Sequence, residues 1–372
     1  MNFKEISGGI KSQFTKDENG KLPIGGTLKK AGKYAYREGT VYIIFVVLFI
    51  FFTCLNPTFA SGRNIMTLLR STAPYLIAGM GIIFVMLTGG IDLSVGYIAA
   101  TCACSCAMLI AAGVPSFVAM LIAIVIGFAL GCINGILSAK LKVFPLIITL
   151  ATQMAFSGLV ALFAGKSKHN VAVEDQWLNT ARFLDLPVSF WIGIVLIVAI
   201  WFVLNKTRFG RNVLAVGGNK ECARLSGVKV DLVITLCYAI CGTFFGLAGC
   251  VVMSVQGYAD NTTANGYEFT CLTAAIIGGI SMMGGKGNVM GMVVGIFIMQ
   301  IISNGMQMAG IESDAQNIVK GAILLAAVAF DMFKNKPIGK VRTKKLNISP
   351  DSSKTGQSPD TGGDIPAAAS KG

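Results

Sequence analysis

The chain has 372 residues, of which 54% are hydrophobic and only 13% charged, and its mean hydropathy is +0.68. This composition excludes a soluble globular domain and is typical of a polytopic helical membrane protein. The formal net charge of +13 is carried by Lys and Arg that lie mostly outside the apolar stretches, a pattern that indicates membrane orientation rather than nucleic-acid binding. We therefore expect membrane lipid, and no nucleic acid, as a partner.

Apolar stretches long enough to approach or exceed the thickness of a bilayer recur from residue 41 to residue 333. Polar and apolar residues do not alternate within them, which predicts helices rather than strands. We expect an all-α polytopic membrane fold with about ten transmembrane helices. They are expected at roughly residues 41–55, 72–88, 95–112, 116–138, 144–164, 188–204, 232–255, 267–281, 288–304 and 315–333.

Two polar ends flank the expected transmembrane domain, which covers residues 40–333. Residues 1–39 form a polar, basic leader, and residues 334–372 are rich in Ser, Pro, Gly, Thr and Lys. The second of these segments cannot bury enough apolar surface to fold, so we expect a disordered tail. Lys and Arg gather in both ends and in the connection 205–231, which places all three on the cytoplasmic side, and an even number of helices agrees with this.

The octapeptide GGIDLSVG at residues 89–96 interrupts the apolar sequence between the second and third expected helices. Its paired glycines do not sustain a regular helix, and Asp92 is an isolated carboxylate in a long, nearly uncharged stretch. Two interpretations remain open. Asp92 either faces a protein interior or a translocation path, or it lies with Ser94 in a short cytoplasmic turn in which both residues cap the following helix.

The ten cysteines and the single histidine do not predict a metal site. Most of the cysteines lie within apolar stretches, where cysteine acts as a small packing residue. In the C-x-C-x-C pattern at residues 102–106, a helix puts only Cys102 and Cys106 on one face. His169 has no second ligand near it in the sequence, so we expect neither bound metal nor histidine-based catalysis.

Two series of glycines with a spacing of four predict close approach of helix backbones, either within one chain or across a dimer. They are Gly127, Gly131 and Gly135 in the fourth expected helix, and Gly287, Gly291 and Gly295 at the start of the ninth.

The connection 205–231 is too long for a minimal helix hairpin. After Gly218 its pattern predicts a short amphipathic helix, in which Asn219 caps the N-terminus and Glu221 lies in the first turn. Ala223, Leu225 and Val228 are expected to supply its apolar contacts. The alternative is a solvated, positively charged loop.

The segment GGNKECARLSGVKV at 217–230 resembles the coupling loop of permease subunits of ribose/galactose/xylose-type ATP-binding-cassette sugar importers, the branched-chain amino acid/ribose permease family. GGIDLSVG is similar to that family's signature between its second and third helices. Further motifs match in the same order, and the resemblance covers about residues 40–333. These motifs are NPTFAS at 56, NKTRFGRN at 205, GYEF at 266, IIGGISMMGGKGNVMG at 276 and IVKGAILLAAVAFD at 318.

The resemblance implies a type II-like importer permease in the bacterial inner membrane. Two permease copies would line one pathway, an extracytoplasmic binding protein would deliver a sugar, and cytoplasmic ATPase subunits would bind ATP with magnesium. This chain has no GxxxxGK[ST] phosphate loop, so it is expected to bind no cofactor and to catalyse no reaction itself.

The matched motifs and the polarity of single residues predict which residues couple to the ATPase and which line the path of the sugar. Coupling to the ATPase is expected at Gly218, Asn219, Glu221, Ala223, Arg224, Leu225, Ser226 and Gly227. The translocation pathway or gate is expected at Gly89, Gly90, Asp92, Ser94, Gly96, Asn134, Glu268, Gly284 and Gly285. Further polar candidates are Thr149, Gln153, Asn304 and Gln307, with Lys320 as a counter-charge.

Two other classes of function remain as alternatives. An ion-gradient-driven secondary transporter would use chains of intramembrane acid and base groups, and Asp92 with Lys320 is too little for such a relay. An integral-membrane enzyme would need paired aspartates or a nucleophile beside a base, whereas the aspartates of this chain are scattered singly. The sequence does not name the sugar.

Overall fold

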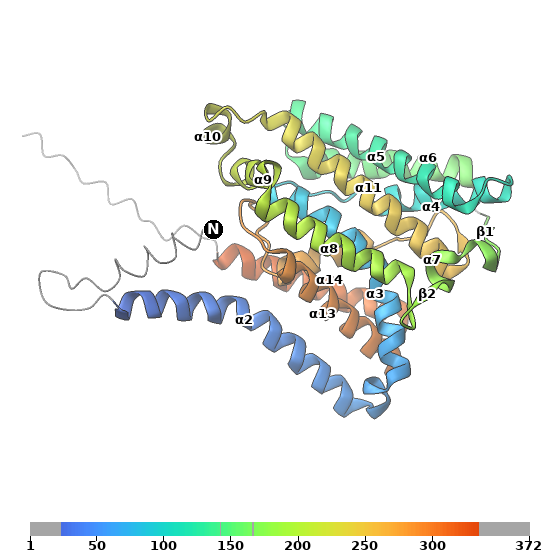
Figure 1. The fold of residues 1–372 in the computed structure, drawn as a ribbon, viewed down its shortest axis with the longest axis horizontal. Helices are drawn as coiled ribbons and strands as arrows, with labels where there is room; N and C mark the ends of the chain where they lie inside the picture. The colour runs from blue at the N-terminus through green and yellow to red at the C-terminus, as the bar shows by residue number, and fades with distance from the viewer. Residues whose placement is uncertain (1–23, 142, 166, 335–372) are drawn as a thin grey trace, which may run out of the picture. The chain divides into compact units, whose positions relative to one another are not determined.

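The computed structural model describes residues 24–141, 143–165 and 167–334 and shows a bundle of helices (Figure 1). The expectations for residues 1–23 and for the tail after residue 334 lie outside the described residues. The long helices are α2 (Ile24–Leu55), α3 (Gly62–Leu87), α4 (Val95–Ala111), α5 (Ser116–Lys140), α6 (Pro145–Ala164), α8 (Val188–Lys206), α11 (Val230–Gln256), α13 (Val289–Met308) and α14 (Ser313–Lys334).

Shorter elements connect these helices. The helical ones are η1 (Pro57–Ala60), η2 (Val173–Asp175), α7 (Trp177–Thr180), α9 (Arg208–Gly218), α10 (Lys220–Leu225) and α12 (Tyr267–Ile277). The strands are β1 (His169–Asn170), β2 (Arg182–Phe183), β3 (Leu186–Pro187) and β4 (Tyr258–Ala259). β1 pairs antiparallel with β4, and β2 with β3. The β1–β4 pair therefore ties the connection after α6 to the connection after α11.

Seven of the described helices are long and apolar enough to cross a membrane: α3, α5, α6, α8, α11, α13 and α14. The other expected spans coincide with shorter apolar helices, Gly39–Leu55, Val95–Ala111 and Tyr267–Ile277. The chain is thus a multi-pass membrane protein. The expected span 267–281 is wrong in its extent, because α12 has 11 residues and rises about 16 Å, roughly half of a hydrocarbon core.

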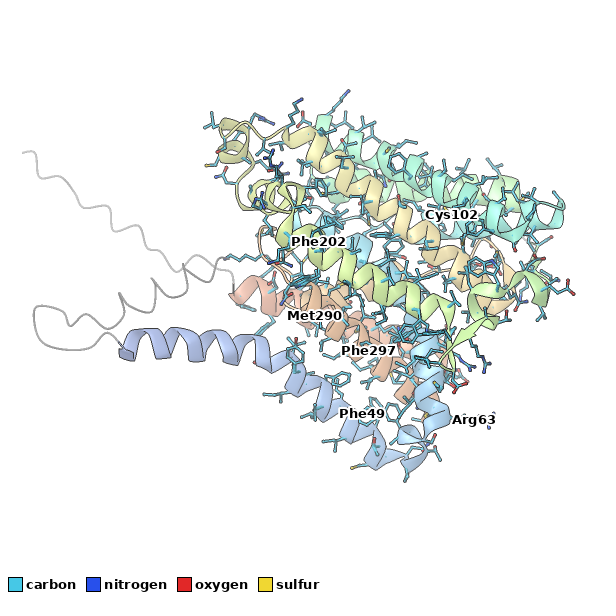
Figure 2. The ribbon with its side chains drawn as sticks, viewed as in Figure 1. Phe49, Arg63, Cys102, Phe202, Met290 and Phe297 are labelled. Carbon is cyan, nitrogen blue, oxygen red and sulfur yellow. The ribbon has the colours of Figure 1, made fainter. Side chains whose placement is uncertain are left out.

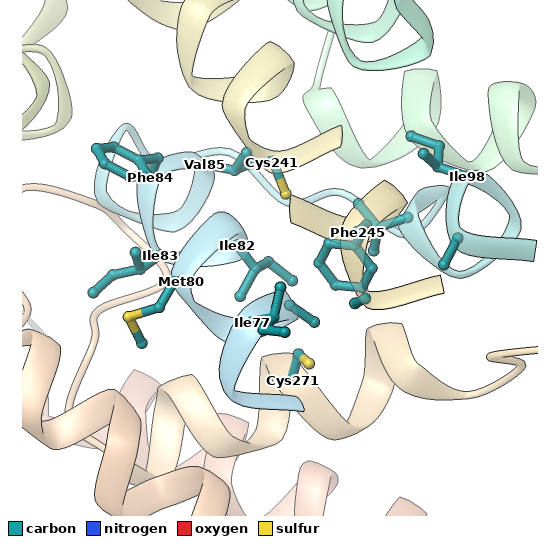
Figure 3. Packing of buried hydrophobic residues seen from close by; sticks show 14 of the residues in the cluster. Ile77, Met80, Ile82, Ile83, Phe84, Val85, Ile98, Cys241, Phe245 and Cys271 are labelled. Carbon is teal, nitrogen blue, oxygen red and sulfur yellow. The ribbon is translucent and has the colours of Figure 1, made fainter. Parts of the chain in front are cut away.

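The centre of the bundle is formed by α3 and α11. In the most apolar window of each helix, 78% and 72% of the residues are buried, and α11 packs against α3, α4 and α5. Figure 3 shows the contact region, where Ile77 and Ile82 of α3 lie near Cys241 and Phe245 of α11. These two helices therefore position the segments that join them to their neighbours.

Helices at the periphery present apolar side chains outward. In α14 no residue of the apolar window is buried, and in α5, α6 and α8 a third or fewer are. Exposed residues of these helices include Met154, Leu325 and Phe202, the last of them labelled on α8 in Figure 2. A surface of this kind suits contact with lipid or with another membrane subunit.

Both glycine series are packing surfaces within the chain. A Cβ atom added at Gly131 of α5 would lie 3.1 Å from the Cα atoms of Ala239 and Gly242 on α11. In the second series, Gly295 of α13 contacts the backbone of α12 at Ala274, and Gly291 contacts Gly278, the residue that follows α12. Gly287 precedes α13 and faces side chains instead. Absence of a side chain thus lets the backbones of α5 and α11 approach closely.

We predict that Gly131→Ala lowers the free energy of unfolding by about 1–3 kcal/mol, because its methyl group would meet backbone atoms that cannot move aside. Gly158→Ala on α6 is the matched control, since nothing lies within 4 Å of a Cβ atom there. Thermal melting of the detergent-solubilised protein should show a lower midpoint for the first variant only. Equal midpoints would contradict the close α5–α11 contact.

Candidate gate and coupling segment

The octapeptide GGIDLSVG separates two helices in the structure. Helix α3 ends at Leu87, Gly89 adopts a φ of +76°, and α4 begins at Val95. A positive φ is accessible to glycine at little cost, which explains the break at this position. The prediction that the paired glycines interrupt the helix is confirmed. Residues 88–94, here called the gate segment, lie between the ends of α3 and α4 and are mostly buried.

A buried hydrogen-bond network organises the gate segment. Asp92, which is 0% exposed, accepts hydrogen bonds at Oδ1 from the backbone N of Ser94 at 2.9 Å and from its Oγ at 2.7 Å. Asn134 Nδ2 of α5 donates to Ser94 Oγ at 2.6 Å. This arrangement orients the residue that precedes α4. Asp92 therefore organises the helix start, whereas the Ser94 side chain makes no cap hydrogen bond, so its predicted capping role is wrong.

Neighbouring helices hold the gate segment through its backbone. The carbonyl of Ile91 accepts from Thr149 Oγ1 of α6 at 3.2 Å, and Tyr238 OH of α11 lies 3.5 Å from the same oxygen. Irregular backbone at membrane depth is tolerated where protein groups satisfy it in this way. Among the described residues Asp92 Oδ2 has no hydrogen-bond partner, and no ion pair joins Asp92 to Lys320, so the counter-charge prediction finds no support.

Three glycine pairs from separate connections meet at one end of α3. They are Gly89–Gly90, Gly217–Gly218 and Gly284–Gly285, and we call their contact the glycine junction. Gly285 N donates to the carbonyl of Leu87 at 2.9 Å. A Cβ atom at Gly217 would collide with that carbonyl and with Gly285 N, and one at Gly284 would lie 2.6 Å from Gly89 N. At Gly217 and Gly284, only glycine permits this approach.

The connection 205–231 contains two helices, of which the sequence analysis predicted only the second. Thr207 caps α9 by accepting a hydrogen bond from Gly210 N at 3.2 Å, and Val213 and Val216 are buried. This short helix follows α8 directly, and Figure 1 shows α9 and α10 together at the end of the bundle remote from β1 and β2. The apolar face of α9 was overlooked because charged and glycine residues surround it.

Helix α10 agrees with the sequence-based prediction at its start and differs at its end. Asn219 accepts a hydrogen bond from Cys222 N at 3.0 Å, and Ala223 is buried. Leu225 is 88% exposed, so the residues that the structure describes do not bury it as predicted. Arg224 pairs with Glu221 at 3.0 Å and approaches Asp231 at 3.7 Å. An exposed leucine beside a fixed arginine is a surface suited to a partner.

The remaining predicted pathway residues divide between two places. Glu268, in the first turn of α12, is 2% exposed and lies against Gly96 in the first turn of α4. Asn304 of α13 is hydrogen bonded to Asn64 of α3 at 2.9 Å, away from the gate segment. Gln153 is partly buried and Gln307 is exposed. The structure thus brings Gly96 and Glu268 together, whereas Asn304, Gln153 and Gln307 lie apart from this pair.

Comparison with known proteins identifies relatives along most of the chain. A family model described as "Branched-chain amino acid transport system / permease component" matches residues 64–328. The ribose import permease protein RbsC of Bacillus subtilis is 34% identical over 329 residues, covering 88% of this chain and 100% of that protein. No solved structure matches significantly.

Relatives named for other sugars are equally similar. The L-arabinose transport system permease protein AraH of Escherichia coli is 36% identical, covering 79% of this chain and 90% of that protein. The galactose/methyl galactoside import permease protein MglC of Escherichia coli is 32% identical, covering 82% and 97%. This multi-pass membrane chain therefore belongs to the family of branched-chain amino acid transport system permease components.

Proposed function

We propose that the chain is the non-catalytic permease subunit of an ATP-driven monosaccharide importer in the bacterial inner membrane. The observation that carries this proposal is its similarity to import permeases for ribose, arabinose and galactose along 90% or more of their length. Two copies would line the pathway, a binding protein would deliver the sugar outside, and ATPase subunits holding ATP with magnesium would dock inside.

The docking surface for the ATPase is α10 with the end of α9. It lies in the connection that is rich in Lys and Arg, which supports a cytoplasmic position for it and for both termini. Leu225 projects from α10 with 88% of its surface exposed, and Arg224 is oriented by two carboxylates. Arginine is enriched at interface hot spots, and docking would remove the apolar surface of Leu225 from water.

Motion of the docked ATPase reaches the gate segment through the glycine junction. Gly217 lies in the last turn of α9, where it contacts both the end of α3 at Leu87 and the loop that follows α12 at Gly285. Close-packed backbone contacts transmit displacement because they have no flexible side chains between them. A shift of α9 therefore moves the start of the gate segment and the loop that follows α12 together.

The gate segment itself acts as a helix break whose geometry is kept by hydrogen bonds. Asp92 organises the turn before α4, and Asn134 connects that turn to α5. The buried polar groups keep this irregular stretch from collapsing onto apolar neighbours. We assign Asp92 a hinge role rather than direct contact with the sugar.

We predict ATP-driven uptake that depends on Leu225. With the ATPase and binding-protein partners present, uptake should stop on ATP depletion and survive collapse of ion gradients. Leu225→Asp should weaken ATPase association by roughly 30-fold or more, since hot-spot losses are about 2 kcal/mol or larger. Co-purification and uptake assays measure the two effects. Leu184→Asp, exposed in the turn between β2 and β3 that precedes α8, is the control, and equal association of both variants with the ATPase would reject α10 as the docking surface.

Gly217→Ala should separate ATP hydrolysis from transport. Its methyl group would push apart Leu87 and Gly285, so we expect at least a tenfold loss of uptake while the ATPase stays bound and active. Gly218→Ala is the comparison, because a Cβ atom there meets nothing within 4 Å, and it should retain most of the uptake. Parallel measurement of ATPase activity and uptake in proteoliposomes checks this. Similar uptake by both variants would argue against transmission through the junction.

Asp92→Asn should keep the sugar preference and lose less transport rate than Asp92→Ala. Asparagine retains the acceptor oxygen for Ser94, whereas alanine leaves buried donors unpaired at a cost of about 1–3 kcal/mol. Thermal melting and uptake of competing sugars measure the two effects. A changed preference in Asp92→Asn would instead indicate direct binding of the sugar.

A further inference from the structure

A cluster of polar groups with unused hydrogen-bonding capacity lies between the first turns of α4 and α12. Its residues line a common recess, which in this conformation is too narrow for a water molecule. They are Gly96, Tyr97, Asn261, Thr263, Asn265 and Glu268. Three of them come from the turn that joins β4 to α12, Glu268 comes from the first turn of α12, and Gly96 and Tyr97 come from α4.

Glu268 is the buried charge of the recess. It is 2% exposed, and its Oε2 atom has no hydrogen-bond partner in the described part of the chain. That oxygen points at Gly96, because a Cβ atom there would collide with it. A buried carboxylate oxygen without a donor is costly, so a site that leaves one free calls for a ligand that donates hydrogen bonds.

The backbone around Glu268 explains why no basic residue is needed beside it. Glu268 lies in the first turn of α12, and Gly96 lies in the first turn of α4, so two helix N-termini face the same carboxylate. Free N–H groups and the helix dipole stabilise negative charge there. The two helix N-termini offset the charge of Glu268 only in part, and the carboxylate itself disfavours an anionic ligand.

The other groups of the recess are neutral donors and acceptors. The turn is anchored by Asp260, whose Oδ1 accepts hydrogen bonds from Thr262 and Thr263. Across the described residues the side-chain amides of Asn261 and Asn265 make no hydrogen bond. Asn265 is exposed and Asn261 partly exposed, so they form the outer rim. Two free amides beside a carboxylate and an aromatic ring match the alternating hydroxyl groups and apolar face of a polyol.

We propose that this recess is a binding site for a neutral monosaccharide on the permease itself, with Glu268 and Asn265 contacting its hydroxyl groups. This assignment rests on the proposed function and adds a point of stereochemical selection after the binding protein. The recess begins at Gly96, two residues after Ser94, so an occupying sugar would lie about half a helical turn from the hydrogen bonds of the gate segment. Opening of the gate segment would widen the recess by moving α4 relative to α12.

The test compares maximal transport rates for three sugars in the complete importer. Wild type and variants are reconstituted with their ATPase and one saturating binding protein, and uptake of labelled D-ribose, L-arabinose and D-galactose is measured. If only one sugar is transported, its singly deoxygenated analogues replace the others. Because the binding protein is the same throughout, changes in the ratio of rates report the permease alone.

Glu268→Gln and the rim variant Asn265→Ala should each change the ratio of rates by at least threefold. Thr262→Ala is the structural control, since its hydroxyl supports the same turn but lies outside the recess, and it should scale all rates by one factor. The proposal is overturned if Glu268→Gln and Asn265→Ala also scale all rates equally. Uptake is also measured with choline in place of sodium. If this replacement slows uptake by wild type but not by Glu268→Gln, the recess binds a cation and the proposal is overturned. Absence of any ATP-driven sugar uptake by wild type would instead refute the proposed function.

Discussion

Close contact between backbones is the constraint on which the rest of this structure depends. At the glycine junction Gly217, Leu87 and Gly285 approach without any side chain between them. The same kind of contact joins α5 to α11 through Gly131 and Gly242. In a bilayer, apolar side chains gain little by leaving lipid, so helix association relies on packing at short range. The junction thus makes three separate connections behave as one unit.

Buried polar groups supply the specificity that packing alone does not. Asp92, Ser94 and Asn134 fix how the chain enters α4, while Glu268 lies at the first turn of α12 on the other side of Gly96. Both carboxylates retain an oxygen without a partner in the described chain. Such groups are costly at membrane depth, and their location on either side of one helix start fits a part of the protein that changes conformation.

In the proposed coupling segment, some features follow from neighbouring residues in the sequence, and others depend on contacts with distant residues. Asn219 and the residues after it predicted α10 correctly because capping is a local property. Helix α9 was missed, since its apolar face is short and is recognisable only by what it contacts. The exposure of Leu225 could not be derived either, because an apolar residue on an amphipathic helix is ordinarily assigned to the core of its own chain.

The sequence by itself determined that the chain is a helical membrane protein, where its helices are interrupted, and which family it resembles. These properties follow from apolar length, glycine pairs and ordered motifs, all of which are local along the chain. Only the tertiary structure decided that Gly217 meets Leu87, that Asn134 supports Ser94, and that Glu268 faces Gly96. The physical reason is that such contacts join residues far apart in sequence, and they depend on how whole helices pack.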